Sequence, residues 1–290
     1  MRRLFLVAAL VVLGAAPAAQ ATFPGANGRV AASQTIDEGE GFVTEALITL
    51  APNGRGRGRD ARFLRECARM NGEPEEGSDC DAEYRAPAWA PDGKRLAFDA
   101  GDSLALINAD KSGFKRLSRS SADDSNPAFS PSGRQLVFHG RAATAQAIFV
   151  RSLDGGAARR LAAGASAPDW SERNVIAYVR NGAIFSSRPD GSKRRRITTG
   201  REPSWSPDGR SLAFSRSGGI YVARADGRRA RRVVRCSGCR TPVFSPDGKL
   251  LVIDLKGLRT VRVSDGRLVR QVIDDTGDAI DFSEPSWQPR

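Results

Sequence analysis

Four cysteines are the residues whose spacing first suggests chemistry. Cys236 and Cys239 form a C-x-x-C sequence, while Cys67 and Cys80 lie in a separate polar stretch. A C-x-x-C pair serves in redox sites, zinc sites and small disulfide loops. A redox pair is typical of a helix N-terminus, whereas Gly238 and the flanking apolar runs indicate strands. In an oxidising compartment we predict two local disulfides, Cys67–Cys80 and Cys236–Cys239, with a zinc site from all four cysteines as the alternative.

The single histidine limits the catalytic sites that this chain can build. His139 follows Phe138 at the end of an apolar run, so we expect it at a strand end on the surface. One histidine excludes metal sites that need several. The chain also lacks the Gly-x-Ser-x-Gly sequence of serine hydrolases and a glycine-rich phosphate loop. We therefore predict no catalytic residues, no metal and no cofactor.

Acidic residues leave one enzymatic alternative open. Paired carboxylates cleave glycosidic bonds without histidine, so a hydrolase or lyase using carboxylates in a central channel is the second hypothesis. A further acidic cluster lacks the spacing of an EF-hand calcium loop, and we expect it to be a solvated linker: Asp274, Asp275, Asp278 and Asp281.

The basic composition alone does not indicate a nucleic-acid partner. The formal net charge is +12, and 39 of the 45 basic residues are arginine. Glycine and arginine alternate over residues 54–59, which we interpret as a lengthened turn between two strands. The aromatic residues lie in repeated positions away from the basic runs, so no stacking platform for single strands is evident.

The first residues have the pattern of an export signal. Arg2 and Arg3 precede an apolar run over residues 4–13, and Ala19-Gln20-Ala21 fits the small-x-small cleavage rule. The run is too short to span a bilayer, and no second long apolar segment follows. We predict a signal peptide over residues 1–21 and a periplasmic or secreted protein without a transmembrane segment.

A sixfold repeat predicts the fold. The pattern proline, any residue, then Trp or Phe recurs at intervals of 35 to 43 residues, a period typical of four-stranded propeller blades. Its copies are Pro87-Ala88-Trp89, Pro127-Ala128-Phe129, Pro168-Asp169-Trp170, Pro203-Ser204-Trp205, Pro242-Val243-Phe244 and Pro285-Ser286-Trp287.

Turn and strand signals follow each copy in the same order. Ser206-Pro207-Asp208-Gly209 is the clearest first turn, and its proline and glycine suit a type I turn. Two apolar runs follow, then usually an Asp-Gly hairpin such as Asp226-Gly227, then a short arginine-containing strand. Continuous apolar runs indicate strands covered on both faces, and charge on the last strand suits an exposed edge.

The two ends of the chain complete the count of blades. The sixth aromatic motif ends before its turn can form, while residues 29–33 read as a second strand without a first. We predict an all-β, six-bladed propeller over residues 22–290, with four antiparallel strands per blade. The C-terminal strand joins the N-terminal blade and closes the ring. A longer link over about residues 65–86 is predicted to be an insertion stapled by Cys67 and Cys80.

The repeat resembles the WD-like propeller repeat of the TolB family. Residues 203–214 and 220–222 match its pattern almost throughout, and the resemblance extends over roughly residues 24–290. It implies an exported protein-interaction scaffold. We expect the propeller alone, because no α/β domain stands between the signal sequence and the first blade.

Charge is distributed unevenly among the turns. The first and third turns of the blades are rich in arginine and lysine, whereas the second turns and the links between blades are acidic. We predict a monomeric, non-enzymatic scaffold that binds an envelope protein or an anionic cell-surface polymer, and no nucleic acid. The basic focus is the predicted partner site: Lys193, Arg194, Arg195, Arg228, Arg229 and Arg231.

Overall fold

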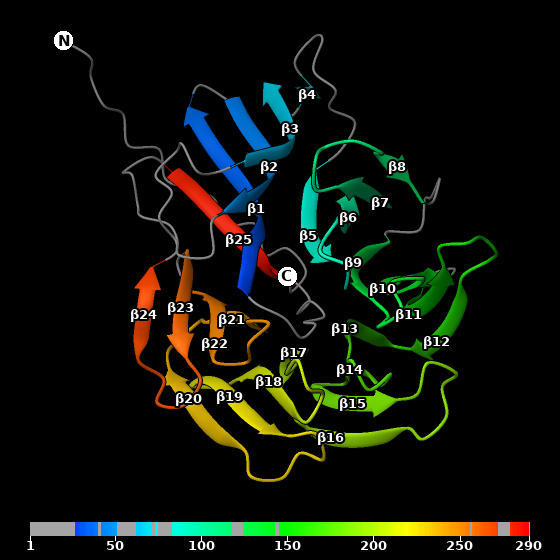
Figure 1. Cartoon of the computed structure of the whole chain (residues 1–290), viewed down its shortest axis with the longest axis vertical. Helices are drawn as coiled ribbons and strands as arrows, with labels where there is room; N and C mark the ends of the chain where they lie inside the picture. Colours follow the sequence, from blue (N-terminus) through cyan, green and yellow to red (C-terminus); the bar gives the residue numbers. More distant parts are fainter. Residues whose placement is uncertain are drawn as a thin grey trace.

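The structure is a ring of six antiparallel sheets (Figure 1). The computed structural model describes residues 27–39, 42–50, 62–70, 73–74, 83–117, 124–142, 145–255, 257–271 and 279–289. Every regular element within these residues is a β-strand. The predicted six-bladed propeller with four strands per blade is confirmed, and blade 1 adds a short fifth strand at its outer edge.

Each blade runs from an inner first strand to an outer last strand (Figure 1). Blade 1 consists of β25 (Ala279–Pro289), β1 (Asn27–Gly39), β2 (Phe42–Leu50), β3 (Arg62–Met70) and β4 (Glu73–Pro74). Blade 2 consists of β5 (Tyr84–Trp89), β6 (Arg95–Ala100), β7 (Ser103–Asn108) and β8 (Lys115–Arg116). Blade 3 consists of β9 (Ser125–Phe129), β10 (Gln135–Ala142), β11 (Ala145–Ser152) and β12 (Arg159–Ala163).

The three remaining blades are the most regular. Blade 4 consists of β13 (Ala165–Trp170), β14 (Ile176–Arg180), β15 (Ala183–Ser187) and β16 (Arg195–Thr199). Blade 5 consists of β17 (Arg201–Trp205), β18 (Ser211–Arg216), β19 (Gly219–Arg224) and β20 (Arg231–Arg235). Blade 6 consists of β21 (Arg240–Phe244), β22 (Leu250–Asp254), β23 (Leu258–Arg262) and β24 (Leu268–Gln271).

The first turn of each blade is held as its sequence predicts. In blade 5 the Gly209 N–H donates to the Ser206 carbonyl at 2.8 Å, and Gly209 has a φ of 62°. The Ser206 hydroxyl accepts the Ser211 N–H at 2.9 Å and donates to Asp208 at 2.6 Å. In blade 4 the turn has no glycine, and Asn174 takes the left-handed conformation with a φ of 57°. Asn tolerates this conformation better than most residues other than glycine.

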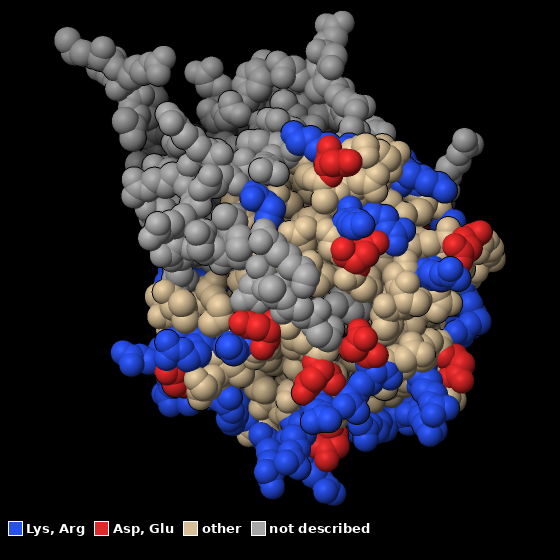
Figure 2. Space-filling view, viewed as in Figure 1, with Lys and Arg blue, Asp and Glu red and all other residues tan. Residues whose placement is uncertain are grey.

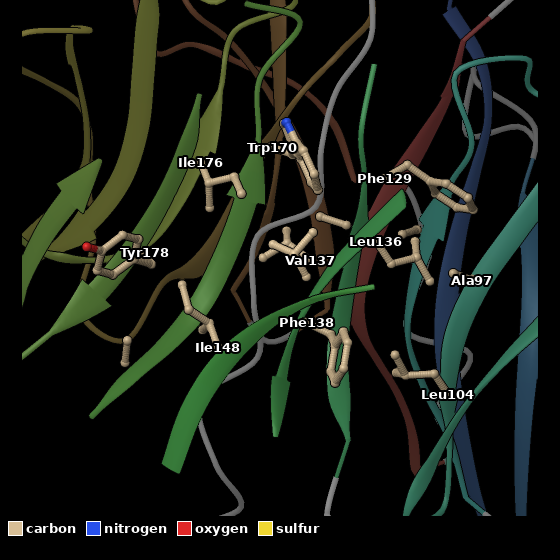
Figure 3. Close-up of a cluster of buried hydrophobic side chains, with 14 of the residues drawn as sticks. Ala97, Leu104, Phe129, Leu136, Val137, Phe138, Ile148, Trp170, Ile176 and Tyr178 are labelled. Atoms are coloured by element: carbon tan, nitrogen blue, oxygen red, sulfur yellow. The ribbon is translucent and has the colours of Figure 1, made fainter. Parts of the chain in front are cut away.

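The buried aromatic residues of the repeat fill the space between blades. All four tryptophans are almost fully buried. One apolar cluster joins blades 2, 3 and 4, where Trp170 packs with Phe129, Val137 and Ile148 (Figure 3). Adjacent blades therefore cover both faces of the inner strands, which explains the continuous apolar runs.

Pairing of β25 with β1 closes the ring, as predicted. Trp287 lies opposite Val30 and Ser286 lies opposite Ala31 in an antiparallel register. The last strand of the chain thus supplies the inner strand of blade 1, and the predicted closure is confirmed.

Blade 1 is larger than its repeat predicts. β1 has 13 residues and β3 has nine, against five or six in most strands of blades 4 to 6. β3 runs to Met70, within the segment predicted to be an insertion, and contains Cys67. Cys80 lies outside the described residues, as do the signal sequence, the Gly-Arg tract and Asp274, Asp275 and Asp278.

The expectation for His139 was wrong. The residue lies inside β10, opposite Ile148, and only 9% of its surface is exposed. Its Nδ1 atom lies 3.3 Å from the Ser125 hydroxyl. The strand continues to Ala142, beyond the apolar run, so hydrophobicity alone placed its end too early.

Candidate functional site

The predicted partner residues lie on the third turns of blades 4 and 5. These basic turns, residues 188–195 and 224–231, contain eight lysines and arginines and two aspartates. Asp190 accepts the Ser192 N–H at 2.8 Å, and Asp226 accepts the Arg228 N–H at 2.9 Å. Hydrogen bonds from Ser192 lower the pKa of Asp190, which keeps this turn acid ionised. The two aspartates therefore shape the turns.

Both turns have the same local conformation. Lys193 and Arg229 occupy matching positions with φ values of 51° and 54°. Gly227 fits closely against the backbone carbonyl of Ile197 in β16, so a side chain at this position would collide with blade 4. Gly227 and Gly266 thus allow both a turn and a close approach to the preceding blade.

All six predicted residues are exposed, but they have two different roles. Arg195 Nη2 donates to the Ala225 carbonyl at 3.0 Å, and Arg231 Nη2 donates to the Val263 carbonyl at 2.6 Å. Arg159 makes the equivalent bond to the Pro189 carbonyl. These arginines begin the last strand of one blade and bind the third turn of the next. We call Arg159, Arg195 and Arg231 the clamp arginines.

The remaining four residues of the predicted site are Lys193, Arg194, Arg228 and Arg229. They project from the tips of the basic turns, and Arg228 lies 3.9 Å from Asp226. Lysine and arginine gather along the edge of the ring where Figure 1 places β16 and β20 (Figure 2). These four side chains give the basic turns a positively charged surface, because none of them is a clamp arginine.

An open groove lies beside these turns, between blades 5 and 6. Its volume is about 600 Å³. Three arginines (Arg224, Arg229 and Arg231) and two aspartates (Asp208 and Asp247) line it, together with the apolar side chains of Val222 and Phe244. It lies on the same side of the ring as the basic turns, because the Ala225 N–H bonds the Arg210 carbonyl across the first and third turns of blade 5. The surface therefore combines positive charge with an apolar recess.

The carboxylate hypothesis calls for buried or clustered acids. Asp169 is a fully buried acid, and it binds backbone amides. Asp169 Oδ2 on β13 accepts the Trp205 N–H of blade 5 at 2.6 Å, and Oδ1 accepts the Trp170 N–H at 2.9 Å. Complete burial outweighs these two bonds and raises the pKa of Asp169 to about 8. Sequence reasoning treated Asp169 only as the variable residue of its motif.

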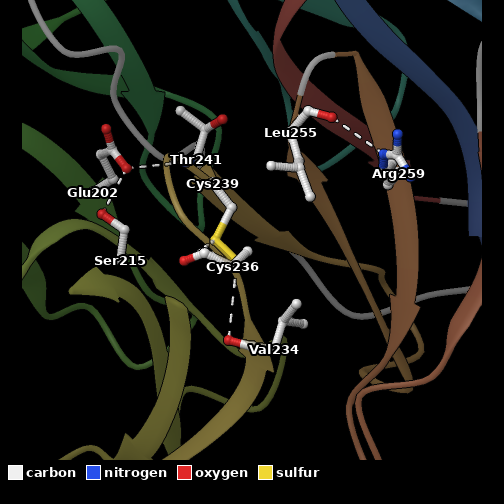
Figure 4. Close-up of a disulfide and its surroundings, with 8 residues drawn as sticks. All are labelled: Glu202, Ser215, Val234, Cys236, Cys239, Thr241, Leu255 and Arg259. Atoms are coloured by element: carbon white, nitrogen blue, oxygen red, sulfur yellow. Dashed lines mark hydrogen bonds between the residues drawn. A yellow bond between two sulfur atoms is a disulfide. The ribbon is translucent and has the colours of Figure 1, made fainter. Parts of the chain in front are cut away.

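Two further acids join neighbouring blades by binding the amide of the residue that precedes the repeated proline. Glu202 Oε2 accepts the Thr241 N–H at 3.0 Å and the Ser215 hydroxyl at 2.7 Å (Figure 4). Asp99 Oδ1 accepts the Asn126 N–H at 2.8 Å. Burial is the main cause that raises the pKa of Glu202. Thr241 and Asn126 precede the repeated proline and have positive φ, so these acids satisfy amides turned out of the strand ladder.

The described part of the chain has two further negative findings. It contains no group of three or more His, Cys, Asp or Glu residues placed to hold a metal ion. It also contains no helix with the length and apolar character needed to cross a membrane.

Comparisons with known proteins identify the fold. No family model matches the sequence, and no curated protein matches it either. The structure of TolB from Acinetobacter baumannii is 16% identical, with a TM-score of 0.67 over 91% of this chain and 67% of that one. A TolB structure from Agrobacterium tumefaciens is 19% identical, with a TM-score of 0.62 over 90% of this chain and 99% of that one.

Enzymes share the architecture as well. A hydrazine synthase from Kuenenia stuttgartiensis is 13% identical, with a TM-score of 0.69 over 92% of this chain and 47% of that one. An oligogalacturonate lyase in complex with manganese is 14% identical, with a TM-score of 0.54 over 87% of this chain and 77% of the lyase. The chain thus has the TolB-like propeller fold that its repeat implied. Because one fold hosts unrelated activities, function has to be argued from the surface.

Proposed function

We propose that this protein is an exported scaffold that binds an anionic partner in the cell envelope through its basic turns, a role that needs no catalytic residues at those turns. The partner is an acidic protein segment or an anionic cell-surface polymer, and it contacts the tips of the basic turns. The TolB-like fold supports a binding role, and the sequence pattern of residues 1–21 supports export. The chemistry of the turns supports the sign of the partner's charge.

The observation that favours this function is the separation of clamps from tips. Arg195 and Arg231 bind the next blade, whereas Lys193, Arg194, Arg228 and Arg229 point outward from turns fixed by those clamps. Fixed cations on two neighbouring turns attract an extended anion and lose less conformational entropy than mobile ones. The groove between blades 5 and 6 would receive an apolar group next to the anionic one.

The test replaces Lys193, Arg194, Arg228 and Arg229 with serine and leaves the clamps intact. A matched variant replaces four exposed basic residues of blades 2 and 3 with serine and removes the same total charge: Lys94, Lys111, Arg141 and Arg160. Binding of poly-L-glutamate and recovery of partners from envelope extract are measured at low and high salt. We expect the first variant to bind about tenfold more weakly at low salt, and the matched variant less than threefold more weakly.

Equal binding by the parent and the first variant would show that the basic turns are only a solvated surface. Equal weakening in both variants would show that net charge alone attracts the polymer. Export is tested separately by mass spectrometry of the protein from the envelope fraction. The measured mass should match a chain that begins at Thr22.

A further inference from the structure

A second hollow lies on the other side of blade 5, next to the disulfide Cys236–Cys239. Its volume is about 600 Å³, and it is lined by residues 216–219, by Arg232 and Arg235, and by residues 236–239. The Cys236 N–H bonds the Gly218 carbonyl at 3.3 Å, which joins the link after β20 to the second turn of the blade. We call this site the cysteine hollow.

Arginines give the cysteine hollow its electrostatic character. Arg216, Arg232 and Arg235 line it, and none of the described residues lining it is acidic. The Arg216 guanidinium lies 4.0 Å from the centre of the Tyr221 ring. Hydrogen bonds and charge from Arg216 and Arg232 lower the pKa of Tyr221, so two of the cations converge on one side chain. Positive surroundings of this kind stabilise thiolates and so activate cysteines.

The two sulfurs differ in accessibility. Cys236 is half-buried, whereas Cys239 is 7% exposed. The intervening Ser237 and Gly238 are exposed, so an incoming thiol reaches Cys236 first.

The strand after the disulfide is anchored without it. β21 is held by its pairing with β22 and by the bond between Glu202 and the Thr241 N–H (Figure 4). We therefore expect the reduced form to remain folded, with β21 in place.

We propose that the cysteine hollow is a thiol–disulfide exchange site for anionic thiols. The thiolate of the substrate attacks Cys236 Sγ, forms a mixed disulfide there and displaces Cys239 as a thiolate. A second substrate thiolate attacks the substrate sulfur and displaces Cys236. Two thiols thereby lose two electrons and two protons to give one disulfide, and the protein disulfide gains the two electrons. A disulfide-bearing protein restores the oxidised pair by the reverse exchange.

The cysteine pair lies between β20 and β21, so no helix N-terminus is available to activate it. In the structure three arginines supply the positive potential that a helix N-terminus provides elsewhere. The site does not depend on the basic turns, because it lies on the opposite side of the ring.

The test measures reduction of the native protein by two small thiols of similar size and opposite charge. They are 3-mercaptopropionate and cysteamine, and their rates are expressed per thiolate. Acid quenching, alkylation and mass spectrometry then follow the peptide that contains Cys236 and Cys239. We expect the anionic thiol to react at least tenfold faster at low salt, and this preference to shrink as salt rises.

Variants assign the preference to the hollow. In Arg216→Gln/Arg232→Gln/Arg235→Gln the preference should fall to about threefold or less, and Arg235→Gln alone should lower it without loss of fold. Arg194→Gln/Arg228→Gln/Arg229→Gln has the same change in net charge on the opposite side and should keep the preference. Reduction that occurs only at the rate of global unfolding, or equal rates for both thiols in the parent, would overturn the proposal.

Discussion

Two of the contacts, or joints, between neighbouring blades satisfy the N–H of a buried tryptophan, and they use different acceptors. Between blades 4 and 5, the buried carboxylate of Asp169 accepts the Trp205 N–H at 2.6 Å. Between blades 1 and 2, the buried hydroxyl of Ser286 accepts the Trp89 N–H at 3.2 Å. Asp169 and Ser286 occupy the same position of the repeat, between the proline and the tryptophan.

The hydrogen bond is common to both joints, whereas only the joint at Asp169 has an ionisable group. Both joints satisfy the amide of a buried tryptophan, so the geometry requires an acceptor but no ionisable group. The carboxylate adds a second bond to the Trp170 N–H and makes its joint sensitive to pH. The serine joint lacks that sensitivity, but it also belongs to the strand that closes the ring.

The largest effect is expected at the serine joint. Deletion of residues 283–290 removes Trp287 from the core and leaves the inner edge of β1 without its partner. Loss of a buried tryptophan alone costs about 3–5 kcal/mol, so the melting temperature should fall by at least about 10 °C. Thermal unfolding followed by circular dichroism checks this, and an unchanged curve would contradict the role of the closure.

The next effect is expected when Asp169 is replaced by Asn. At pH 5 the neutral acid of the parent still has a lone pair on each oxygen, whereas the amide nitrogen of Asn accepts no hydrogen bond. One of the two N–H donors therefore loses its acceptor, and we expect a loss of about 3 kcal/mol. Asp169→Ser is the matched control, because it copies Ser286, and it should cost about 1–2 kcal/mol. Urea unfolding measures both. Greater damage from Ser than from Asn would show that the two joints are not equivalent.

The pH dependence of stability sharpens the same comparison. The folded state holds the pKa of Asp169 at about 8, above its ordinary value, so the unfolded state releases this proton first as pH rises. The contribution to stability is therefore fully present below about pH 4 and is lost as pH rises towards 8.

Between pH 5 and 7 the parent should lose about 2–3 kcal/mol of its free energy of unfolding relative to Asp169→Ser. The measurement is a series of urea curves for both proteins at the same ionic strength. Parallel pH profiles would show that the two N–H donors keep the carboxylate ionised despite its burial.

The smallest effect is expected at the clamps on the outside of the ring. Arg195→Gln removes the bond to the Ala225 carbonyl between blades 4 and 5, and we expect a loss of about 1 kcal/mol because the side chain is exposed. Arg194→Gln removes the same charge at the neighbouring position and should cost less than about 0.5 kcal/mol. Equal losses of unfolding free energy in both variants would show that Arg195 contributes only as a surface charge. Urea unfolding measures both.

The repeat contained most of the information about the architecture. The turns after the aromatic residues predict the blades because turns depend on local backbone preferences. The incomplete sixth copy predicts the closure because the strands that it lacks stand at the start of the repeat region. Blade 1 departs from the repeat, and its longer strands were not predicted. His139 was misplaced because a polar residue can continue a strand when its neighbours cover it.

The joints between blades could not be predicted in the same way. The bonds of Asp169 and Arg195 link residues 36 and 30 positions apart. The bond between Ser286 and Trp89 spans 197 positions, and the geometry of each bond depends on how two sheets pack. One signal was present, because each clamp arginine stands five residues after the aspartate of an Asp-Gly turn. The interpretation of those arginines as edge charges agreed with their exposure but missed the carbonyls that they bind.

The position of the closing strand also determines when the fold can be completed. β25 follows all the other described strands in the sequence, whereas its partner β1 precedes them. Until β25 has been synthesised, β1 lacks its inner neighbour and Trp287 is absent from the core. Closure then brings together segments about 250 residues apart, a contact of high order with a large entropic cost if the blades between them are not already formed. Blades 2 to 6 therefore form the scaffold on which β1 and β25 meet.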